Sequence, residues 1–569
     1  MTGYQLQAQT SAALLAALPG WRDLQAARPD LDQETVEAIL GEAAKFAEGR
    51  LALVNSPGDA EGCRLDGGRV RTPSGYAQAY QALAGDGWIG MDLDDAHGGQ
   101  GLPVVLHTAA QMLFDRGCTA LMMLAGSSRA AAHLLAAHAD ASVREDWVPA
   151  LCSGHSAATI CISEPDAGSD VGRIRTRGEQ RDGVWHITGQ KIWISFGDHD
   201  MAPRIGHCLL ARTSDAPGTR GLSLFLVPDV LEDGRRNAIV IERIEEKMGL
   251  HGSPTCSMQF EGAEGILIGE EGRGLSQLFT MMEFMRLQTG AQGLGLALGA
   301  AGIAAGYIHE RHQGGDPKRA AVPISAHGDV RRQVLDLSAK AATLHMAVLD
   351  LALLLDRIEL TADPDTRAAL EAQAAFTLPI IKTFGAETAF ETASAAMQVL
   401  GGAGYTREWP VEQILRDCRV LAIYEGTTGM QAQDFLMRRL WRENGAGLKS
   451  FLGAAHSEID KSSSSDSYKI SLKKILEQFE TLSTGMDALK TGNPRAGEFA
   501  AEPYLRAGWA AVSALNAWRL SQLADQPRLA ALGTYRLDQL EGEFAFHAGK
   551  CHAASNSYDV LFETAFPEA

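Results

Sequence analysis

The sequence lacks the signatures of several common protein classes. None of its eight cysteines forms a Cys-x-x-Cys pair, which argues against a zinc ribbon or a disulfide framework and fits a reducing compartment. No Gly-x-Gly-x-x-Gly lies between a strand pattern and a helix pattern, so a Rossmann nucleotide site is not expected. The formal net charge of −19 disfavours nucleic acid as a general partner, although a local basic pocket for one anionic ligand remains possible.

Membrane and export signals are also weak. No basic segment precedes the short apolar run near the N-terminus, so a secretory signal is not expected. One stretch, residues 287–308, is uncharged, but its two glutamines and many Ala and Gly suit a closely packed buried helix better than a membrane span. We therefore expect a cytoplasmic protein without a membrane span.

The patterning predicts an α+β protein of several domains, because 569 residues exceed one compact core. Residues 1–155 form Ala/Leu-rich helical patterns, and residues 156–270 form six or seven short strands without helices between them. The strands predict a small β-sandwich or barrel. Helical patterns return over 271–440 as a bundle, and a polar break at 456–469 interrupts a helical extension over 441–569.

Two generic catalytic motifs are incomplete. The segment Gly154-His155-Ser156-Ala157-Ala158 lacks the closing glycine of a hydrolase nucleophile elbow. His309 and His312 are three residues apart rather than the four of a zinc protease helix. We expect neither a serine hydrolase nor a metal site.

Two other segments could carry chemistry. A glycine-bearing turn at 162–170 and the segment 191–195 offer backbone N–H groups, two serine hydroxyls and a tryptophan. Such groups suit a heteroaromatic ligand on a sheet edge, and the alternative is an ordinary hairpin with a core tryptophan. Glu425 follows the apolar run VLAIY and precedes a Gly-Thr-Thr-Gly turn. Desolvation by the apolar surroundings could raise the basicity of this carboxylate, which could then act as a base. The alternative is a carboxylate at a helix end that takes no part in chemistry.

Together these segments resemble the acyl-CoA dehydrogenase family. The motifs GGQGLP (98–103), ISEPDAGSD (162–170), KIWIS (191–195), QVLGGAGY (398–405) and IYEGTTG (423–429) occur in the family's order. The resemblance covers roughly residues 80–440. It implies a helical domain, a β domain and a second helical domain, with FAD as cofactor.

The resemblance also implies a reaction, the α,β-desaturation of an acyl-CoA thioester to the trans-2-enoyl-CoA, as in fatty acid β-oxidation. A base removes the Cα proton while a hydride leaves Cβ for the flavin. Glu425 matches the family's base, and the alternative position used by a minority of the family is Met285 here, which cannot act. The backbone N–H of the base residue and a flavin hydroxyl would polarise the thioester carbonyl.

Further residues match binding positions of the family. Positions lining the flavin ring, its ribityl chain and its phosphates are matched by Ile162, Ser163, Trp193, Ile194, Ser195, Arg311, Thr427 and Gly429. The ADP half of FAD is contacted in the family by a neighbouring subunit, at positions matched by Gln398, Gly401 and Gly402. Substrate-side positions are matched by Ser169, Arg286 and Gly426. A homodimer is therefore expected.

The chain departs from the family pattern at two places. The usual Arg-x-x-Phe-Gly reads Arg311-His312-Gln313-Gly314-Gly315, so the contacts beside Arg311 are in doubt. Residues 441–569 exceed the family's minimal length and look like the subgroup containing 3-methylmercaptopropionyl-CoA dehydrogenase and long mycobacterial fatty-acyl-CoA dehydrogenases. This resemblance implies 3-methylmercaptopropionyl-CoA or a medium- or long-chain fatty acyl-CoA as the expected substrate, and the sequence alone does not choose between them. An electron-transfer flavoprotein is the implied acceptor, and an acyl-CoA oxidase or a silent flavin or acyl-CoA binding protein are the alternatives.

Overall fold

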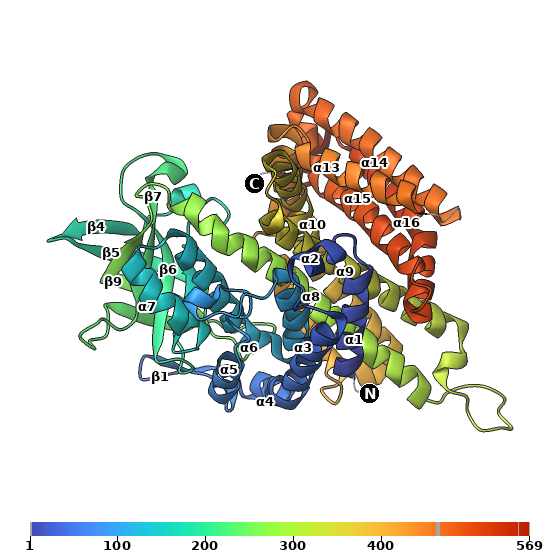
Figure 1. The fold of residues 1–569 in the computed structure, drawn as a ribbon, viewed down its shortest axis with the longest axis horizontal. Helices are drawn as coiled ribbons and strands as arrows, with labels where there is room; N and C mark the ends of the chain where they lie inside the picture. The colour runs from blue at the N-terminus through green and yellow to red at the C-terminus, as the bar shows by residue number, and fades with distance from the viewer. Residues whose placement is uncertain (1–2, 463–466, 556, 568–569) are drawn as a thin grey trace. The chain divides into compact units, whose positions relative to one another are not determined.

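The structure is a computed structural model that describes residues 3–462, 467–555 and 557–567. It divides into two compact units, Glu42–Gln288 and the combination of Met1–Gly41 with Thr289–Ala569. Helices α3 (Gln33–Phe46) and α8 (Gly274–Glu310) each run from one unit into the other. Helices, then strands, then helices follow one another along the chain, in agreement with the predicted α+β architecture (Figure 1). The bounds of the four predicted domains remain predictions.

The first part of the unit 42–288 is helical. Its helices are α4 (Ala52–Glu61), α5 (Tyr76–Gly85), α6 (Val104–His138) and α7 (Ala141–Cys152). Helix α6 is buried on nearly all sides, which explains why its sequence is apolar around the whole helix rather than along one stripe.

A short hairpin interrupts these helices, where the sequence had been interpreted as helical only. Strands β1 (Arg64–Asp66) and β2 (Arg69–Arg71) pair antiparallel. Gly67 and Gly68 connect them with φ of 57° and 76°, a conformation that glycine adopts without strain. The Asp66-Gly67-Gly68 sequence is typical of a hairpin turn, but the flanking residues are mostly charged and lack the apolar pattern by which a strand is recognised.

The seven-stranded sheet closes on itself as a barrel. Its strands are β3 (Ser156–Cys161), β4 (Arg177–Arg181), β5 (Val184–Ser195), β6 (Arg204–Arg212), β7 (Leu222–Pro228), β8 (Ile239–Ile244) and β9 (Thr255–Ile268). Antiparallel pairing links β6 to β7, β7 to β9, β9 to β5 and β5 to β4. The parallel pair Arg177↔Arg212 between β4 and β6 completes the circuit. Strand β3 adds to β6, and β8 adds to β9.

Both faces of the barrel wall are buried, which explains the near-continuous apolar runs in β6 and β7. Leu209 and Phe225 lie in the core inside the barrel, whereas Leu210 and Leu224 lie in a second core with residues of α6, α7 and the start of α8. Successive side chains of a strand point to opposite faces, so a strand covered on both sides has little room for polar residues.

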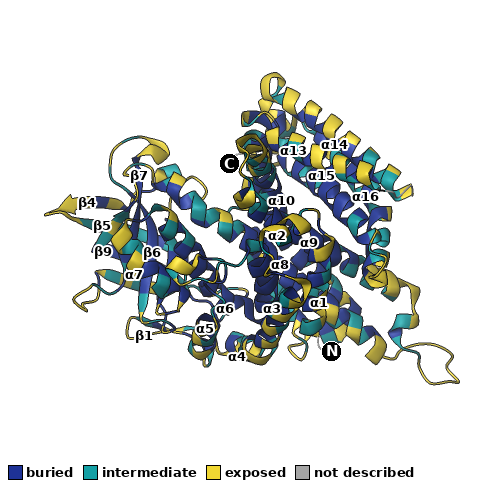
Figure 2. Cartoon of the chain, in the orientation of Figure 1, coloured by how far each residue is buried: buried dark blue, intermediate teal, exposed yellow. Residues whose placement is uncertain are grey.

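The other unit is a helical bundle. It holds α1 (Gly3–Ala17), α2 (Trp21–Ala27), α9 (Gly328–Leu360), α10 (Pro364–Leu400), α11 (Val411–Cys418) and α12 (Thr428–Gln433), with the greater part of α8. Helices α8 and α10 meet backbone to backbone, because a Cβ on Gly293 would lie 2.1 Å from the carbonyl oxygen of Gly385. Figure 2 shows α8 as largely buried. The uncharged, glycine-rich stretch of α8 is thus explained by close helix packing.

Five helices form the C-terminal extension: α13 (Ala446–Lys461), α14 (Ser467–Gly492), α15 (Pro494–Ser521), α16 (Pro527–Ala553) and α17 (Ser557–Ala565). Its core is shared with α10, since Phe376 of α10 packs against Phe451 and Phe479, and Phe384 stacks on Trp509 at 4.9 Å (Figure 1). Helix α13 continues into the predicted polar break as far as Lys461. Residues 463–466 of that break lie outside the described residues.

Three helices of the described chain have the length and composition to cross a membrane. They are α6, α8 and α9, and in each the most apolar 18-residue window is mostly buried within the protein, at 83%, 67% and 83%.

Candidate active site

The structure brings the two predicted ligand segments of the β domain together. Ile162 and Ser163 directly follow β3, and Trp193 to Ser195 end β5. The backbone N–H of Ile192 donates to the carbonyl oxygen of Ser163 at 2.9 Å, so the two segments are directly joined. Ile162, Ser163 and Ser195 are half-buried, whereas Ile194 is buried in the barrel core.

Trp193 does not lie in a core, which removes the hairpin-with-core-tryptophan alternative. Its side chain is 60% exposed, and its φ of +63° places it in the left-handed region. The register of β5 against β9 shifts between Lys191 and Ile194. Such a bulge re-aims a side chain, and strain of this kind in a large residue is typical of functional sites.

A buried ion pair lies at the start of this bulge. The Nζ of Lys191 lies 2.8 Å from Oε1 of Glu164 and donates to the carbonyl oxygen of Ile162 at 3.0 Å. Lys191 is fully buried and Glu164 is 6% exposed. Burial alone would raise the pKa of Glu164, but Lys191 and backbone N–H donors hold it below its ordinary value. Burial likewise lowers the pKa of Lys191, against the attraction of Glu164.

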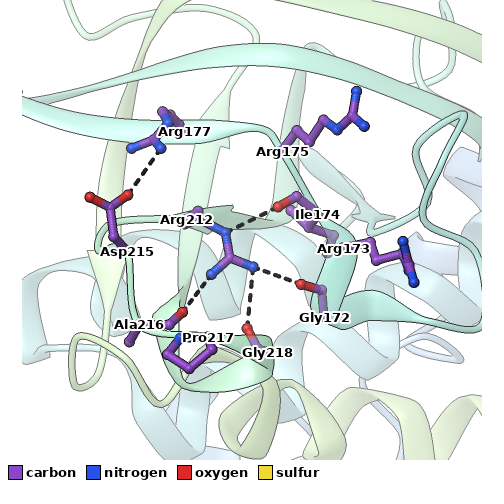
Figure 3. A pocket seen from close by; sticks show the side chains of 10 residues that line it. All are labelled: Gly172, Arg173, Ile174, Arg175, Arg177, Arg212, Asp215, Ala216, Pro217 and Gly218. Carbon is purple, nitrogen blue, oxygen red and sulfur yellow. Dashed lines mark hydrogen bonds and ion pairs between the residues drawn. The ribbon is translucent and has the colours of Figure 1, made fainter.

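An open cavity of about 560 Å³ is lined by residues from Gly172 onward, three positions after Ser169 in the chain (Figure 3). It is lined by ten residues, of which four are arginines: Arg173, Arg175, Arg177 and Arg212. Ser169 itself is exposed, and its neighbour Asp170 pairs with Arg173 at 2.8 Å.

Arg212 builds the wall of this cavity. Its guanidinium donates to the carbonyl oxygens of four residues on both sides of the hollow: Ile174, Ala216, Gly172 and Gly218. Arg173 pairs with Asp170 and Arg175 with Asp166 at 3.1 Å, but their side chains keep 74% and 79% of their surface exposed, so an anion from solvent can reach them. The cavity is therefore chemically suited to phosphate groups.

Glu425 lies in a short loop between the 3₁₀ turn Arg419–Ala422 and α12. Its φ is +54°, and the following Gly426 has φ +90°. Glu425 is half-buried. A glutamate in the left-handed region is uncommon, which indicates that its surroundings impose the conformation.

Two buried side chains hold this loop. Lys382 of α10 donates from Nζ to the carbonyl oxygens of Leu421 at 2.9 Å and Gly426 at 2.7 Å. Gln431 of α12 donates from Nε2 to the carbonyl oxygen of Glu425 at 3.1 Å. Sequence reasoning missed both residues, although a lysine inside the apolar run LPIIKTF was a visible signal of a buried charge with a specific partner.

The residues after Gly426 belong to the start of α12. Thr427 is its N-cap and accepts from the backbone N–H of Met430 at 3.3 Å, while Gly429 is exposed in the first turn. Thr428 donates to Glu387 of α10 at 3.0 Å. Thus Glu425, Gly426, Thr427 and Gly429 belong to one short segment of the bundle unit, of which Thr427 and Gly429 are exposed.

The remaining predicted residues lie at helix ends. Gln398 is exposed in the last turn of α10, and Gly401 and Gly402 are exposed directly after it. Arg311 is exposed just beyond α8, where its carbonyl oxygen accepts from the N–H of Ile324. Each is accessible for a ligand or a second chain.

Arg286 belongs to the other unit, with the β-domain residues. It is half-buried on α8, and its Nε is buried with no hydrogen-bond partner among the described residues. The preceding Met285 is 4% exposed and packs in the core outside the barrel. Over residues 3–462, 467–555 and 557–567, no group of three His, Cys, Asp or Glu side chains could hold a metal ion.

Three protein-family models match successive parts of the chain. The N-terminal, middle and C-terminal domains of acyl-CoA dehydrogenases match residues 33–155, 159–263 and 272–440. The chain therefore belongs to the acyl-CoA dehydrogenase family, whose members are FAD-dependent oxidoreductases.

Individual relatives agree with this assignment. The chain is 35% identical over 473 residues to 3-methylmercaptopropionyl-CoA dehydrogenase of Ruegeria pomeroyi, which covers 80% of both chains. It is 32% identical over 486 residues to the broad-specificity linear acyl-CoA dehydrogenase FadE5 of Mycobacterium tuberculosis, covering 81% of this chain and 79% of that one. The crystal structure of an acyl-CoA dehydrogenase from Bacillus anthracis complexed with FAD shares the fold, with TM-score 0.76, 18% identity and coverage of 94% and 91%. The predictions of family, fold and FAD cofactor are confirmed.

Proposed function

We propose that Glu425 is the base with which this dehydrogenase removes the α-proton of an acyl-CoA, yielding the trans-2-enoyl-CoA. The observation that carries the assignment is the strained backbone of Glu425, held by the buried donors of Lys382 and Gln431. A strained residue persists only where the surrounding contacts over-determine it, and such residues cluster at reactive sites. A fixed carboxylate meets the geometric demand on a general base.

The residues of the β domain fit FAD. Trp193 presents a flat aromatic surface to solvent, and Ser163 and Ser195 supply hydroxyls on the same wall. Ile162 and Ile194 belong to the same two segments. Lys191, which pairs with Glu164, links these segments through its hydrogen bond to the carbonyl oxygen of Ile162. When bound, FAD supplies the acceptor for the hydride that leaves Cβ.

The arginine-lined cavity fits the phosphates of the CoA moiety (Figure 3). Arg173 and Arg175 would bind them, beside Ser169. Loss of one charge-assisted hydrogen bond, as in Arg175→Ala, should raise KM for an acyl-CoA by roughly tenfold. The corresponding acyl-pantetheine lacks the nucleotide phosphates, so its KM should stay unchanged. Equal effects on both substrates would show that the cavity does not bind phosphate.

The decisive experiment is anaerobic reduction of the bound flavin by a panel of acyl-CoAs, with 3-methylmercaptopropionyl-CoA and medium- and long-chain fatty acyl-CoAs. Glu425→Gln should abolish the loss of visible flavin absorbance, whereas the control Glu391→Gln, on the exposed face of α10, should not. If Glu425→Gln is reduced as fast as wild type, the base assignment is wrong. Bound FAD that no acyl-CoA reduces would favour a silent binding protein, and rapid reoxidation by oxygen would favour an oxidase.

We further propose an electron-transfer flavoprotein as acceptor, a homodimer and a cytoplasmic location. Family membership supports the acceptor, and the exposure of Gln398, Gly401 and Gly402 supports a contact with a second copy. All eight cysteines are described and none is in a disulfide, which supports a reducing compartment. Light scattering, fractionation of cells and turnover with an added electron-transfer flavoprotein test these points separately.

A further inference from the structure

Lys382 has an environment that is costly for a lysine. It lies in the middle of α10, its side chain is fully buried, and the neighbouring Ile380, Ile381 and Phe384 are buried apolar residues. Burying an ammonium group is unfavourable unless specific acceptors replace water. Here the acceptors include two backbone carbonyl oxygens of the loop that carries the base, those of Leu421 and Gly426.

These two carbonyls bracket the reactive residue. Leu421 is the last residue but one of the 3₁₀ turn before the loop, and Gly426 follows Glu425 directly. Between them, the N–H groups of Ile423 and Tyr424 donate to the carbonyl oxygen of Val420 at 2.8 and 3.1 Å, so the first part of the loop is fixed by its own backbone. Lys382 adds a tie from this part to Gly426, across Glu425. An ammonium group bonded to both ends sets the distance across the loop and thereby the direction of the Glu425 side chain.

A second side chain acts on the same loop from the opposite end. Gln431, which is 1% exposed, donates to the carbonyl oxygen of Glu425 and lies one turn into α12. Helix α12 is tied to α10 by the bond from Thr428 to Glu387, one turn after Lys382. Thus α10 holds the loop through Lys382 and the helix after it through Glu387.

We propose that Lys382 is a positioning residue for the reaction, which holds Glu425 in its left-handed conformation and aims its carboxylate at the substrate. This inference rests on the proposed role of Glu425 as base. Misplacement of a reacting group by about 1 Å can cost on the order of 10²-fold in rate. We therefore expect Lys382→Met, which keeps most of the side-chain length and removes the donors, to slow flavin reduction by roughly 100-fold.

Three readouts separate positioning from general loss of structure. First, kcat should fall while KM changes little, because substrate binding does not use Lys382. Second, the primary deuterium isotope effect at Cα should rise, because proton removal becomes slower than the other steps. Third, hydrogen–deuterium exchange of the peptide spanning residues 421–431 should increase, in a measurement that does not depend on activity.

The matched control is Thr383→Val, because Thr383 is the next residue on α10 and is 1% exposed. Its hydroxyl has no hydrogen-bond partner among the described residues. It should keep the wild-type rate, isotope effect and exchange. If Lys382→Met does not fold, Gln431→Met tests the same loop. Its kcat, isotope effect and hydrogen–deuterium exchange should change in the same directions as in Lys382→Met, but by less.

Wild-type rates, isotope effect and exchange in Lys382→Met would overturn the inference. Glu425→Gln is measured alongside to separate the two claims. An inactive Glu425→Gln with an unaffected Lys382→Met refutes only the positioning role, whereas a fully active Glu425→Gln refutes the base assignment itself.

Discussion

Removing the buried cation Lys191 should destabilise the β-domain unit strongly. In Lys191→Met, the Glu164 carboxylate stays buried and loses the partner that lies 2.8 Å away, while the carbonyl oxygen of Ile162 loses a donor. Removing one partner of a buried pair typically costs about 3–5 kcal/mol, because an uncompensated charge remains in the interior. For a unit of about 250 residues this corresponds to a fall in Tm of roughly 6–20 °C.

Glu164 also accepts from the backbone N–H groups of Arg175 at 2.7 Å and Thr176 at 3.1 Å. The neutral side chain of Glu164→Gln carries no charge and keeps one acceptor oxygen, which serves one of these two donors. The double variant Lys191→Met/Glu164→Gln should therefore regain part of the lost Tm.

Thermal melting of the holoenzyme, followed by flavin fluorescence, measures both variants, and FAD titration of the apoprotein gives the affinity. The single variant should bind FAD more weakly, because the segment of Ile162 and Ser163 loses its hydrogen bond from Lys191. A Lys191→Met protein with wild-type Tm and FAD affinity would refute the reasoning. So would a double variant no more stable than the single one.

Three further predictions concern other parts of the molecule. Trp193→Ala should weaken FAD binding by roughly tenfold through loss of an aromatic contact, with little change in the Tm of the apoprotein because the side chain is 60% exposed. Gly293→Ala should cost about 1–3 kcal/mol in melting experiments, because its Cβ would meet the backbone of Gly385, whereas Gly306→Ala on the same helix meets nothing and should stabilise by about 0.5–1 kcal/mol. Burial lowers the pKa of His345 to about 3, so the unfolded chain binds a proton below pH 6.5 that the folded chain does not. The contribution of His345 to the free energy of unfolding should thus be fully present above pH 6.5 and fall by about 1.4 kcal/mol per pH unit below it. In His345→Gln, Tm should lose the corresponding part of its pH dependence.

Much of the architecture follows from local sequence patterns. The short apolar runs of β6 and β7 and the turn clusters between strands identify the β domain, because a strand that is covered on both faces is apolar along its length. The hairpin at 64–71 escaped this reasoning, since its strands are charged and only the Gly67-Gly68 turn marks it. The uncharged stretch of α8 was interpreted as a close-packed helix, and its contact with Gly385 supplies the reason.

The candidate site was predicted only in part. Motifs identified Trp193 and Glu425 as positions of interest, but no pattern revealed that both have left-handed backbones. Lys191 was noted only as the first residue of a motif, and Lys382 was not singled out at all. The acceptors of Lys382 lie far along the chain, and burial and distance are properties that a linear pattern does not contain.

The order of helices and strands, the family and the residue types available for chemistry follow from the amino-acid sequence, because they depend on short-range backbone preference and motif identity. The three-dimensional fold alone reveals that the barrel closes, that the C-terminal extension shares its aromatic core with α10, and that a buried lysine holds the loop of Glu425. Each of these depends on partners far apart in the chain. Buried charge and close packing are stable only when such partners meet, and their meeting is a property of the fold.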